Sequence, residues 1–257
     1  AIADELEALR ADIESVGSTT GASSLRAVFA DPSLRLPLFV AFSMMVGSQW
    51  SGINAIFFYS TSFFAEAGLN DPVVGTLLAS AVNALAMLAA CPLIETAGRR
   101  RLLLVGVSGM LVTAVVLTVV LVLKEACAVK GACKLLDASS VVCVLLFVTF
   151  FEFGPGPIPW QIGAEIFPET PRATAMGAAA ALNWLCNGAI GLLFPPMQVV
   201  LGAWVFVPFA VVLAAWLAVT LRYTPETKGK SIAQIQMEFA RIAGGEVHLP
   251  LKDVTAL

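Results

Sequence analysis

The chain contains six apolar stretches, each near the ~20 residues that a helix needs to cross a bilayer. Hydrophobic residues make up 58% of the 257 residues, charged residues only 13%, and the mean hydropathy is +0.87. A soluble domain carries about 25% charged residues. The pattern therefore predicts an all-α membrane protein. The stretches cover approximately residues 36–65, 73–95, 101–123, 138–164, 173–195 and 202–221.

The lysines and arginines predict how these stretches are oriented. If the N-terminus is cytosolic, twelve of the fifteen lie on the cytosolic side, and only Lys124, Lys130 and Lys134 lie outside. Positive residues concentrate on the cytosolic side of membrane proteins. We therefore expect both ends to be cytosolic, with a cytosolic amphipathic helix and linker over 1–35, a six-helix bundle over 36–222 and a cytosolic tail over 223–257.

The fourth stretch contains groups that lipid tolerates poorly. The run Phe151–Trp160 places a carboxylate, two glycines and three prolines inside an apolar segment. Proline removes a backbone donor and breaks a helix, and such breaks persist at membrane depth only where they are buried in protein or line a cavity. The run predicts a broken helix beside a polar passage, and an intramembrane carboxylate such as Glu152 is a candidate functional residue.

The six stretches form two sets of three with a matching feature. The first and the fourth open the two sets, and glycines interrupt both: Gly47 and Gly52 in one, Gly154 and Gly156 in the other. Interrupted segments at corresponding positions of a repeat indicate a transporter binding site. The pattern thus predicts a 3+3 repeat.

The polar residues singled out inside the stretches include neutral amides and indoles, which suit the hydroxyls of a sugar or polyol. The alternative is that single amides only join neighbouring helices. Asn183 and Asn187 share one helical face, whereas Gln49 and Asn54 can face one ligand only if Gly52 loosens the turn or the ligand spans both. The polar set consists of Gln49, Ser51, Asn54, Asn83, Glu152, Trp160, Gln161, Asn183, Trp184 and Asn187.

An enzyme is disfavoured because the residues for catalysis are missing from the sequence. The only histidine, His248, lies in the tail. No set of residues has metal-ligand spacing, and no glycine loop is suited to phosphate. We expect no catalytic residue, no metal and no cofactor, and the chain has no basic cluster large enough for nucleic acid.

The loops between stretches carry two further patterns. Acids and arginines gather at the cytosolic ends of the stretches, where they either anchor the helices or form a charge network that latches one conformation. On the outer side, Cys127 and Cys133 flank a short loop where a disulfide is chemically permitted. The sequence leaves open whether that disulfide forms.

Five motifs in order resemble the sugar porters of the major facilitator superfamily, and most closely the facilitative glucose transporters. The resemblance covers about residues 1–245 and corresponds to the C-terminal half of such a transporter, so the chain is read as a fragment. It implies a six-helix C-terminal bundle that works with an N-terminal six-helix half. The motifs are Gln49–Ala55, Gly98–Arg100, Phe151–Trp160, Ala164–Pro168 and Pro225–Gly229.

The resemblance also implies roles for single residues. The sugar-contacting or pocket-lining set would be Gln49, Asn54, Asn83, Glu152, Gly156, Trp160 and Asn183, with Phe151 and Trp184 as aromatic walls and Asn187 as a weaker candidate. The cytosolic gate would be Glu95, Arg99, Arg100, Glu165, Arg172 and Glu226. The family commonly has a second glutamine where this chain has Ser48, and that difference leaves the choice of hexose open.

The expected function is facilitative transport of a glucose-like hexose by alternating access, in a multi-pass protein of the plasma membrane. Expected partners are the hexose, membrane lipid and the N-terminal half. A proton-coupled sugar symporter and a transporter-like sugar sensor are the alternatives. The 35 residues after Arg222 are short for a signalling tail, which argues against a sensor.

Overall fold

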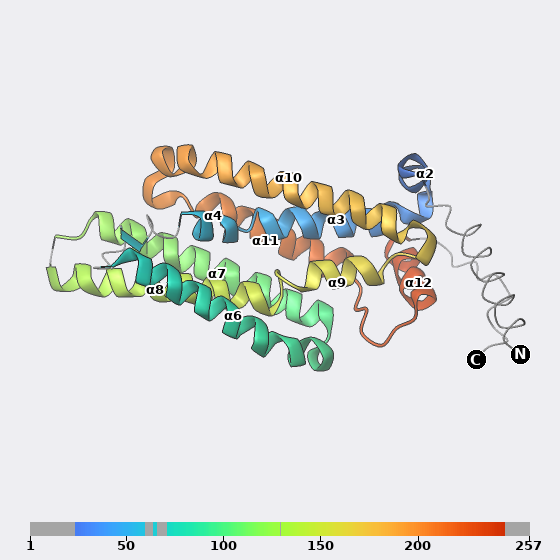
Figure 1. Ribbon diagram of the computed structural model, residues 1–257, viewed down its shortest axis with the longest axis horizontal. Coiled ribbons are helices and arrows are strands. Elements are labelled where there is room, and N and C mark those ends of the chain that lie inside the picture. Colours follow the sequence, from blue (N-terminus) through green and yellow to red (C-terminus); the bar gives the residue numbers. More distant parts are fainter. Residues whose placement is uncertain (1–23, 60–63, 66–70, 129, 245–257) are drawn as a thin grey trace, which may run out of the picture.

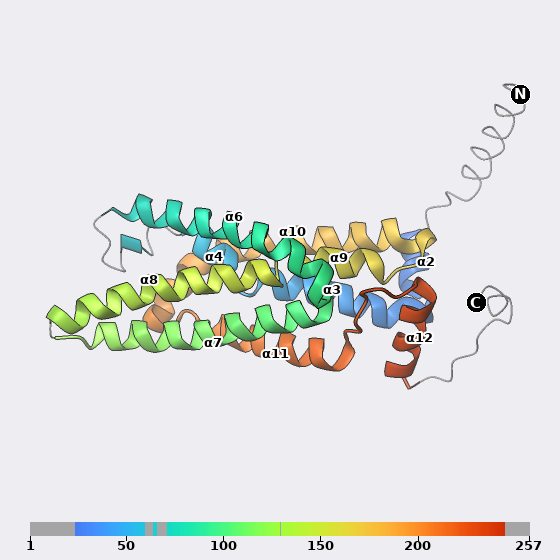
Figure 2. The same ribbon diagram turned by 90° about the horizontal axis from the view of Figure 1, so that it is seen from below.

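The computed structural model describes residues 24–59, 64, 65, 71–128 and 130–244. Within these ranges the chain is helical, without strands. The long helices lie side by side along the long axis, and α2 and α12 lie at one end (Figures 1 and 2). The elements are α2 (Leu25–Ala30), η1 (Pro32–Leu34), α3 (Arg35–Gln49), α4 (Ile53–Phe58), α6 (Pro72–Ala97), α7 (Arg99–Glu125), α8 (Lys130–Phe153), α9 (Ile158–Glu165), α10 (Glu169–Leu201), η2 (Gly202–Trp204), α11 (Val207–Tyr223) and α12 (Ile232–Ile242).

The helices follow the predicted apolar stretches. Within the described residues, five segments are long and apolar enough to cross a membrane, and α11 is a shorter apolar helix of 17 residues. Most of the first 35 residues and His248 lie outside the described residues. The five segments are Pro32–Phe58, Val73–Ala97, Arg99–Glu125, Cys133–Glu165 and Glu169–Trp204.

Both predicted interruptions are present, with one correction. The fourth stretch is broken between Phe153, where α8 ends, and Ile158, where α9 begins. The first stretch is broken after Gln49, but Gly47 lies inside α3 and does not interrupt it. A Cβ atom at Gly47 would lie 2.2 Å from the Trp216 ring. Glycine is used there for close packing between α3 and α11 rather than for a break.

α10 also differs from its predicted end at residue 195. It continues through Pro195 and Pro196 to Leu201, and Gly202 ends it with φ of 52°. Pro195 has no N–H for the carbonyl of Gly191, four residues earlier. The Tyr59 hydroxyl donates to that carbonyl at 2.7 Å. The helix therefore passes the proline because a neighbouring segment replaces the missing donor.

Glycines allow α7 and α8 to approach closely. A Cβ atom at Gly106 would lie 2.7 Å from the Phe150 carbonyl oxygen and 2.4 Å from Pro155 Cδ. Small residues at such positions let membrane helices pack backbone to backbone. The loop that joins the same two helices is closed by a disulfide between Cys127 and Cys133, whose Cα atoms are 5.8 Å apart. The structure thus forms the disulfide that the sequence left open.

Large apolar side chains on α6 and α10 face outward. Among the long helices, α6 and α10 are covered least by the rest of the chain, because only 22% and 17% of the apolar segment of each is buried. These faces need an apolar environment, either lipid or another protein segment. The most exposed side chains include Leu85 and Leu88 on α6 and Leu185, Leu192 and Val199 on α10.

Gly106→Val is expected to destabilise the protein, because the new side chain collides with backbone and a proline ring that cannot rotate away. Overpacking of this kind costs about 1–3 kcal/mol. Thermal unfolding of the purified membrane protein measures the loss. Gly131→Ala is the control, because a Cβ atom there meets no heavy atom within 4 Å. Equal melting temperatures for the two variants would contradict the packing argument.

Candidate functional site

The break in the first stretch brings two separated amides together. α3 ends at Gln49, Gly52 adopts φ of 98°, and α4 begins at Ile53. Only glycine takes this conformation without strain, and a Cβ atom at Gly52 would lie 2.8 Å from Phe209 Cγ. The Asn54 amide consequently reaches back to donate to Gln49 Oε1.

Four amides from α3, α4 and α10 form one hydrogen-bonded group, here called the amide cluster: Gln49, Asn54, Asn183 and Asn187. Gln49 Nε2 donates to Asn183 Oδ1 at 3.0 Å, and Asn187 Nδ2 donates to Gln49 Oε1 at 3.1 Å. Asn183 is only 2% exposed and donates its own amide to Met45 Sδ. Gln49 is therefore the centre of the cluster, and Asn187, the weaker sequence candidate, belongs to it.

A second polar group surrounds Glu152 near the end of α8. Glu152 is 8% exposed, and its carboxylate accepts a hydrogen bond of 2.5 Å from Asn83 Nδ2 on α6. A Cβ atom at Gly156 would lie 3.3 Å from Glu152 Oε2 and 3.1 Å from the Phe151 ring. The structure thus brings together four predicted residues, with the carboxylate held by an amide rather than by a cation among the described residues.

The two predicted indoles are more exposed than these groups. Trp160 is 40% exposed and Trp184 is 67% exposed. Trp184 follows Asn183 directly on α10, so it points off the face that carries the cluster. A cavity of about 350 Å³ lies between α4, α7, α10 and the η2 turn that precedes α11, and its lining includes Tyr59, Glu125 and Phe206 but no member of the amide cluster. Gln49, Asn54 and Asn187 are only partly buried, so the amide cluster is partly open to the outside of this chain.

Sequence reasoning did not assign a role to the hydroxyls beside the first break. Ser48 Oγ donates to the Pro155 carbonyl at 2.9 Å, and Tyr59 donates to the Gly191 carbonyl. A usable signal was present, because each of these carbonyls lies four residues before a proline, Pro159 or Pro195. A proline four residues ahead leaves a helical carbonyl without its usual donor.

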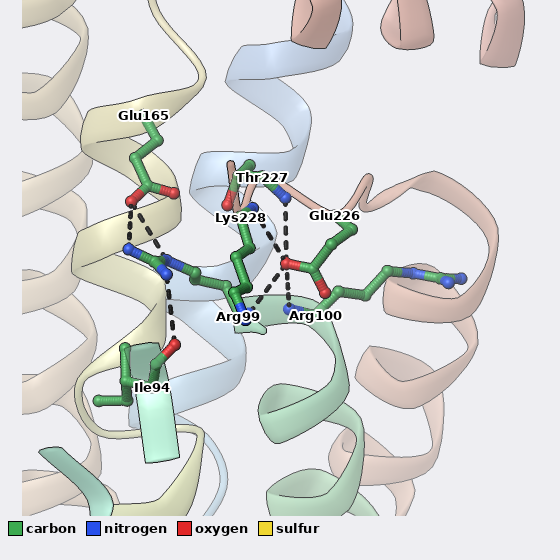
Figure 3. Close-up of polar contacts among 7 residues, drawn as sticks. All are labelled: Ile94, Arg99, Arg100, Glu165, Glu226, Thr227 and Lys228. Atoms are coloured by element: carbon green, nitrogen blue, oxygen red, sulfur yellow. Dashed lines mark hydrogen bonds and ion pairs between the residues drawn. The ribbon is translucent and has the colours of Figure 1, made fainter. Parts of the chain in front are cut away.

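A charged cluster at the α6–α7 turn contains most of the predicted gate residues (Figure 3). The Arg99 guanidinium contacts Glu165 Oε1 through Nε at 3.3 Å and through Nη2 at 3.2 Å. Its Nη1 donates to the Ile94 carbonyl at 3.2 Å. Arg99 thereby joins the end of α9 to the end of α6.

Glu226 caps the start of α7. Its Oε1 accepts from the backbone N–H groups of Arg99 at 2.9 Å and Arg100 at 3.4 Å, and from those of Thr227 and Lys228 at 3.1 and 3.2 Å (Figure 3). The first N–H groups of a helix have no partner within it, and a carboxylate there also meets the positive end of the helix dipole. A residue 127 positions away in sequence thus supplies the cap.

Three remaining gate residues have different surroundings. Arg100 Nη2 donates to the Leu221 carbonyl on α11 at 2.9 Å. Arg172 Nε donates to the Phe167 carbonyl, and Arg172 shares a cavity of about 330 Å³ with Arg99 and Glu165. Glu95 is exposed and is not bonded to the cluster in the described structure. Lys228, which the sequence did not assign to the gate, donates to the Thr96 carbonyl at 2.6 Å.

Comparison with known proteins identifies the family. Residues 2–239 match the family model described as "Sugar (and other) transporter". Solute carrier family 2, facilitated glucose transporter member 3 of Gallus gallus is 43% identical over 82% of this chain and 41% of its own length. Member 3 of Homo sapiens is 40% identical over 85% of this chain and 43% of its own length, and member 2 of Rattus norvegicus is 40% identical over 88% and 42%.

Solved structures show the same fold. A double-tryptophan mutant of XylE matches 79% of this chain and 43% of its own with a TM-score of 0.68 at 22% identity. The MFS (major facilitator superfamily) proton:xylose symporter XylE bound to 6-bromo-6-deoxy-D-glucose matches with a TM-score of 0.67 at 21% identity, over 79% of this chain and 42% of its own. The chain spans less than half the length of these relatives. The helical multi-pass membrane protein described above belongs to the sugar transporter family.

Proposed function

We propose that this chain is one half of a facilitative hexose transporter and supplies one wall of its sugar site. The observation that carries the proposal is the amide cluster at the break between α3 and α4. Neutral amides donate and accept hydrogen bonds without a fixed charge, and sugar hydroxyls do the same. A sugar would exchange the bonds that Gln49 makes within the cluster for bonds to its own hydroxyls.

The open surface supports a second half on the other side of the sugar. Gln49, Asn54 and Asn187 of the amide cluster are only partly buried by this chain, and the outward faces of α6 and α10 are apolar. The relatives are more than twice as long as the matched segment. We infer that an N-terminal six-helix half covers part of these faces and that lipid covers the rest, with the six-helix bundle over 36–222 built as a 3+3 repeat.

Movement of the sugar down its gradient is favoured over proton coupling. The relatives that are 40% identical are named facilitated glucose transporters, whereas the symporter at 21% identity is informative about the fold only. Glu152 also has an ordinary packing role, because Asn83 holds its carboxylate. We propose that the protein lies in the plasma membrane with both ends of this chain cytosolic. The proposed mechanism is alternating access.

Gln49→Ala and Trp160→Ala in the intact transporter are expected to weaken hexose binding about fivefold to tenfold while expression persists. Each removes roughly one hydrogen bond or ring contact to the sugar, worth about 1 kcal/mol. Equilibrium binding of labelled hexose measures the change. Trp204→Ala is the control, since Trp204 is an exposed indole in η2, outside the proposed site. Wild-type affinity in both site variants would show that the pocket assignment is wrong.

Liposomes that contain only residues 1–257 are expected to show no hexose uptake, because one wall of the sugar site and one side of the gate would be missing. The measurement is uptake of labelled hexose beside liposomes that contain the intact transporter. Saturable uptake by the 257-residue chain alone would refute the half-transporter proposal.

The charged cluster is proposed to act as the cytosolic gate, because Arg99 and Glu226 join three helix ends that must separate when the site opens inward.

Glu226→Ala is expected to accelerate amide hydrogen exchange in the first turn of α7 about fivefold, since a lost helix cap costs about 1 kcal/mol. Glu226→Gln keeps one acceptor and should lie between. Glu169→Ala, at the start of α10, is the control. Unchanged exchange in Glu226→Ala would contradict the capping role.

A further inference from the structure

The two interrupted stretches meet at one buried hydroxyl. Ser48 is the second-last residue of α3 and is 5% exposed. Its Oγ donates to the carbonyl of Pro155, which lies buried in the break between α8 and α9, at 2.9 Å. The contact spans 107 positions in the sequence and joins the two segments whose breaks define the site.

The Pro155 carbonyl is available because of the proline that follows it. In a continuous helix the Pro155 carbonyl would accept a hydrogen bond from the N–H of residue 159, but residue 159 is a proline and has no N–H. Water cannot replace the donor at a buried position in an apolar medium, so the carbonyl needs a partner from the protein. Ser48 is that partner.

The hydrogen bonds continue from Ser48 into α4. Ser51, fully buried, donates its hydroxyl to the Ser48 carbonyl at 2.6 Å and accepts from the Ile53 N–H at 3.4 Å. Ile53 is the first residue of α4. An unbroken series of bonds therefore runs from Ile53 through Ser51 and Ser48 to Pro155, here called the hydroxyl link.

We infer that Ser48 is a positioning residue that couples the orientation of α4 to the α8–α9 break. The hydroxyl link lies between the two polar groups of the site, since Gln49 follows Ser48 and Gly156 follows Pro155. Ser48 uses its hydroxyl on the Pro155 carbonyl and is not a sugar ligand. A change in the tilt of α4 is transmitted through the link to α9, so the two interrupted segments move together. The transport consequence rests on the proposed function, but the coupling does not.

Amide hydrogen exchange in the intact purified protein, without sugar, tests the coupling directly. Ser48→Ala leaves the Pro155 carbonyl unpaired and should accelerate exchange about tenfold in the first turns of both α4 and α9. Ser48→Thr keeps the hydroxyl and should restore wild-type exchange. Ser43→Ala is the matched control, because Ser43 bonds only to the Val40 carbonyl of its own helix. Acceleration in only one of the two segments, or in neither, overturns the inference.

Hexose transport kinetics distinguish coupling from a general effect on stability, because coupling should change turnover and leave sugar affinity nearly the same. Ser48→Ala should lower turnover about tenfold while sugar affinity stays within about twofold, because the amide cluster remains intact. Ser51→Ala removes the neighbouring hydrogen bond of the hydroxyl link and should likewise lower turnover with little change in affinity. If one variant fails to fold, the other remains as the test. Loss of affinity with turnover preserved would make Ser48 a sugar contact and overturn the inference. If the wild-type protein moves no hexose, the proposed function fails while the exchange result still decides the coupling.

Discussion

Pairing of backbone carbonyls in an apolar medium is the constraint on which the site depends. Each proline inside a membrane helix removes a donor, and the carbonyl four residues earlier must find another. Two of these carbonyls, at Pro155 and Gly191, are paired by hydroxyls from one short segment, Ser48 at the end of α3 and Tyr59 at the end of α4. The interrupted first stretch is thus fixed at both sides of its break by the prolines of two other helices.

This arrangement places the amide cluster. With its two ends bonded to the α8–α9 break and to α10, the segment between Ser48 and Tyr59 turns at Gly52, and the Asn54 amide reaches Gln49. Asn183 and Asn187 reach the cluster from α10, the helix that Tyr59 holds. The polar side chains converge where hydroxyl groups pair the carbonyls that the prolines leave without a helical donor. The prolines therefore shape the site through their effect on the backbone.

The sequence predicted those parts of the molecule that depend on local chemistry. The length and apolarity of the stretches predicted the helices, and the prolines after Glu152 predicted the break between α8 and α9. Gly52 was correctly named as the residue that could bring Gln49 and Asn54 together. These features are visible along the chain because helix length, missing donors and positive φ are properties of single residues and their neighbours.

What the sequence could not supply depends on contacts between distant segments. Gly47 and Gly52 are both glycines beside polar residues, so the sequence does not distinguish them. Gly47 does not break the helix, and its missing side chain makes room for the Trp216 ring. Glu226 was expected to belong to a charge network at the cytosolic gate. Its observed partners include the backbone N–H groups that begin α7, which no residue pattern reveals. Glu95 carries the same charge near the same turn and remains exposed.

Neutral amides suit a site that must release what it binds. In the structure each member of the amide cluster is already bonded to another member, so no amide in the cluster pays a full desolvation cost. In the proposed function a sugar would replace these internal bonds with bonds of similar strength, and the net gain per bond would be only about 1 kcal/mol. A carboxylate facing the sugar would bind more tightly and release more slowly. Glu152, the one buried carboxylate among the described residues, is instead held by Asn83, which would leave the amides to make a contact that is specific in geometry and modest in strength.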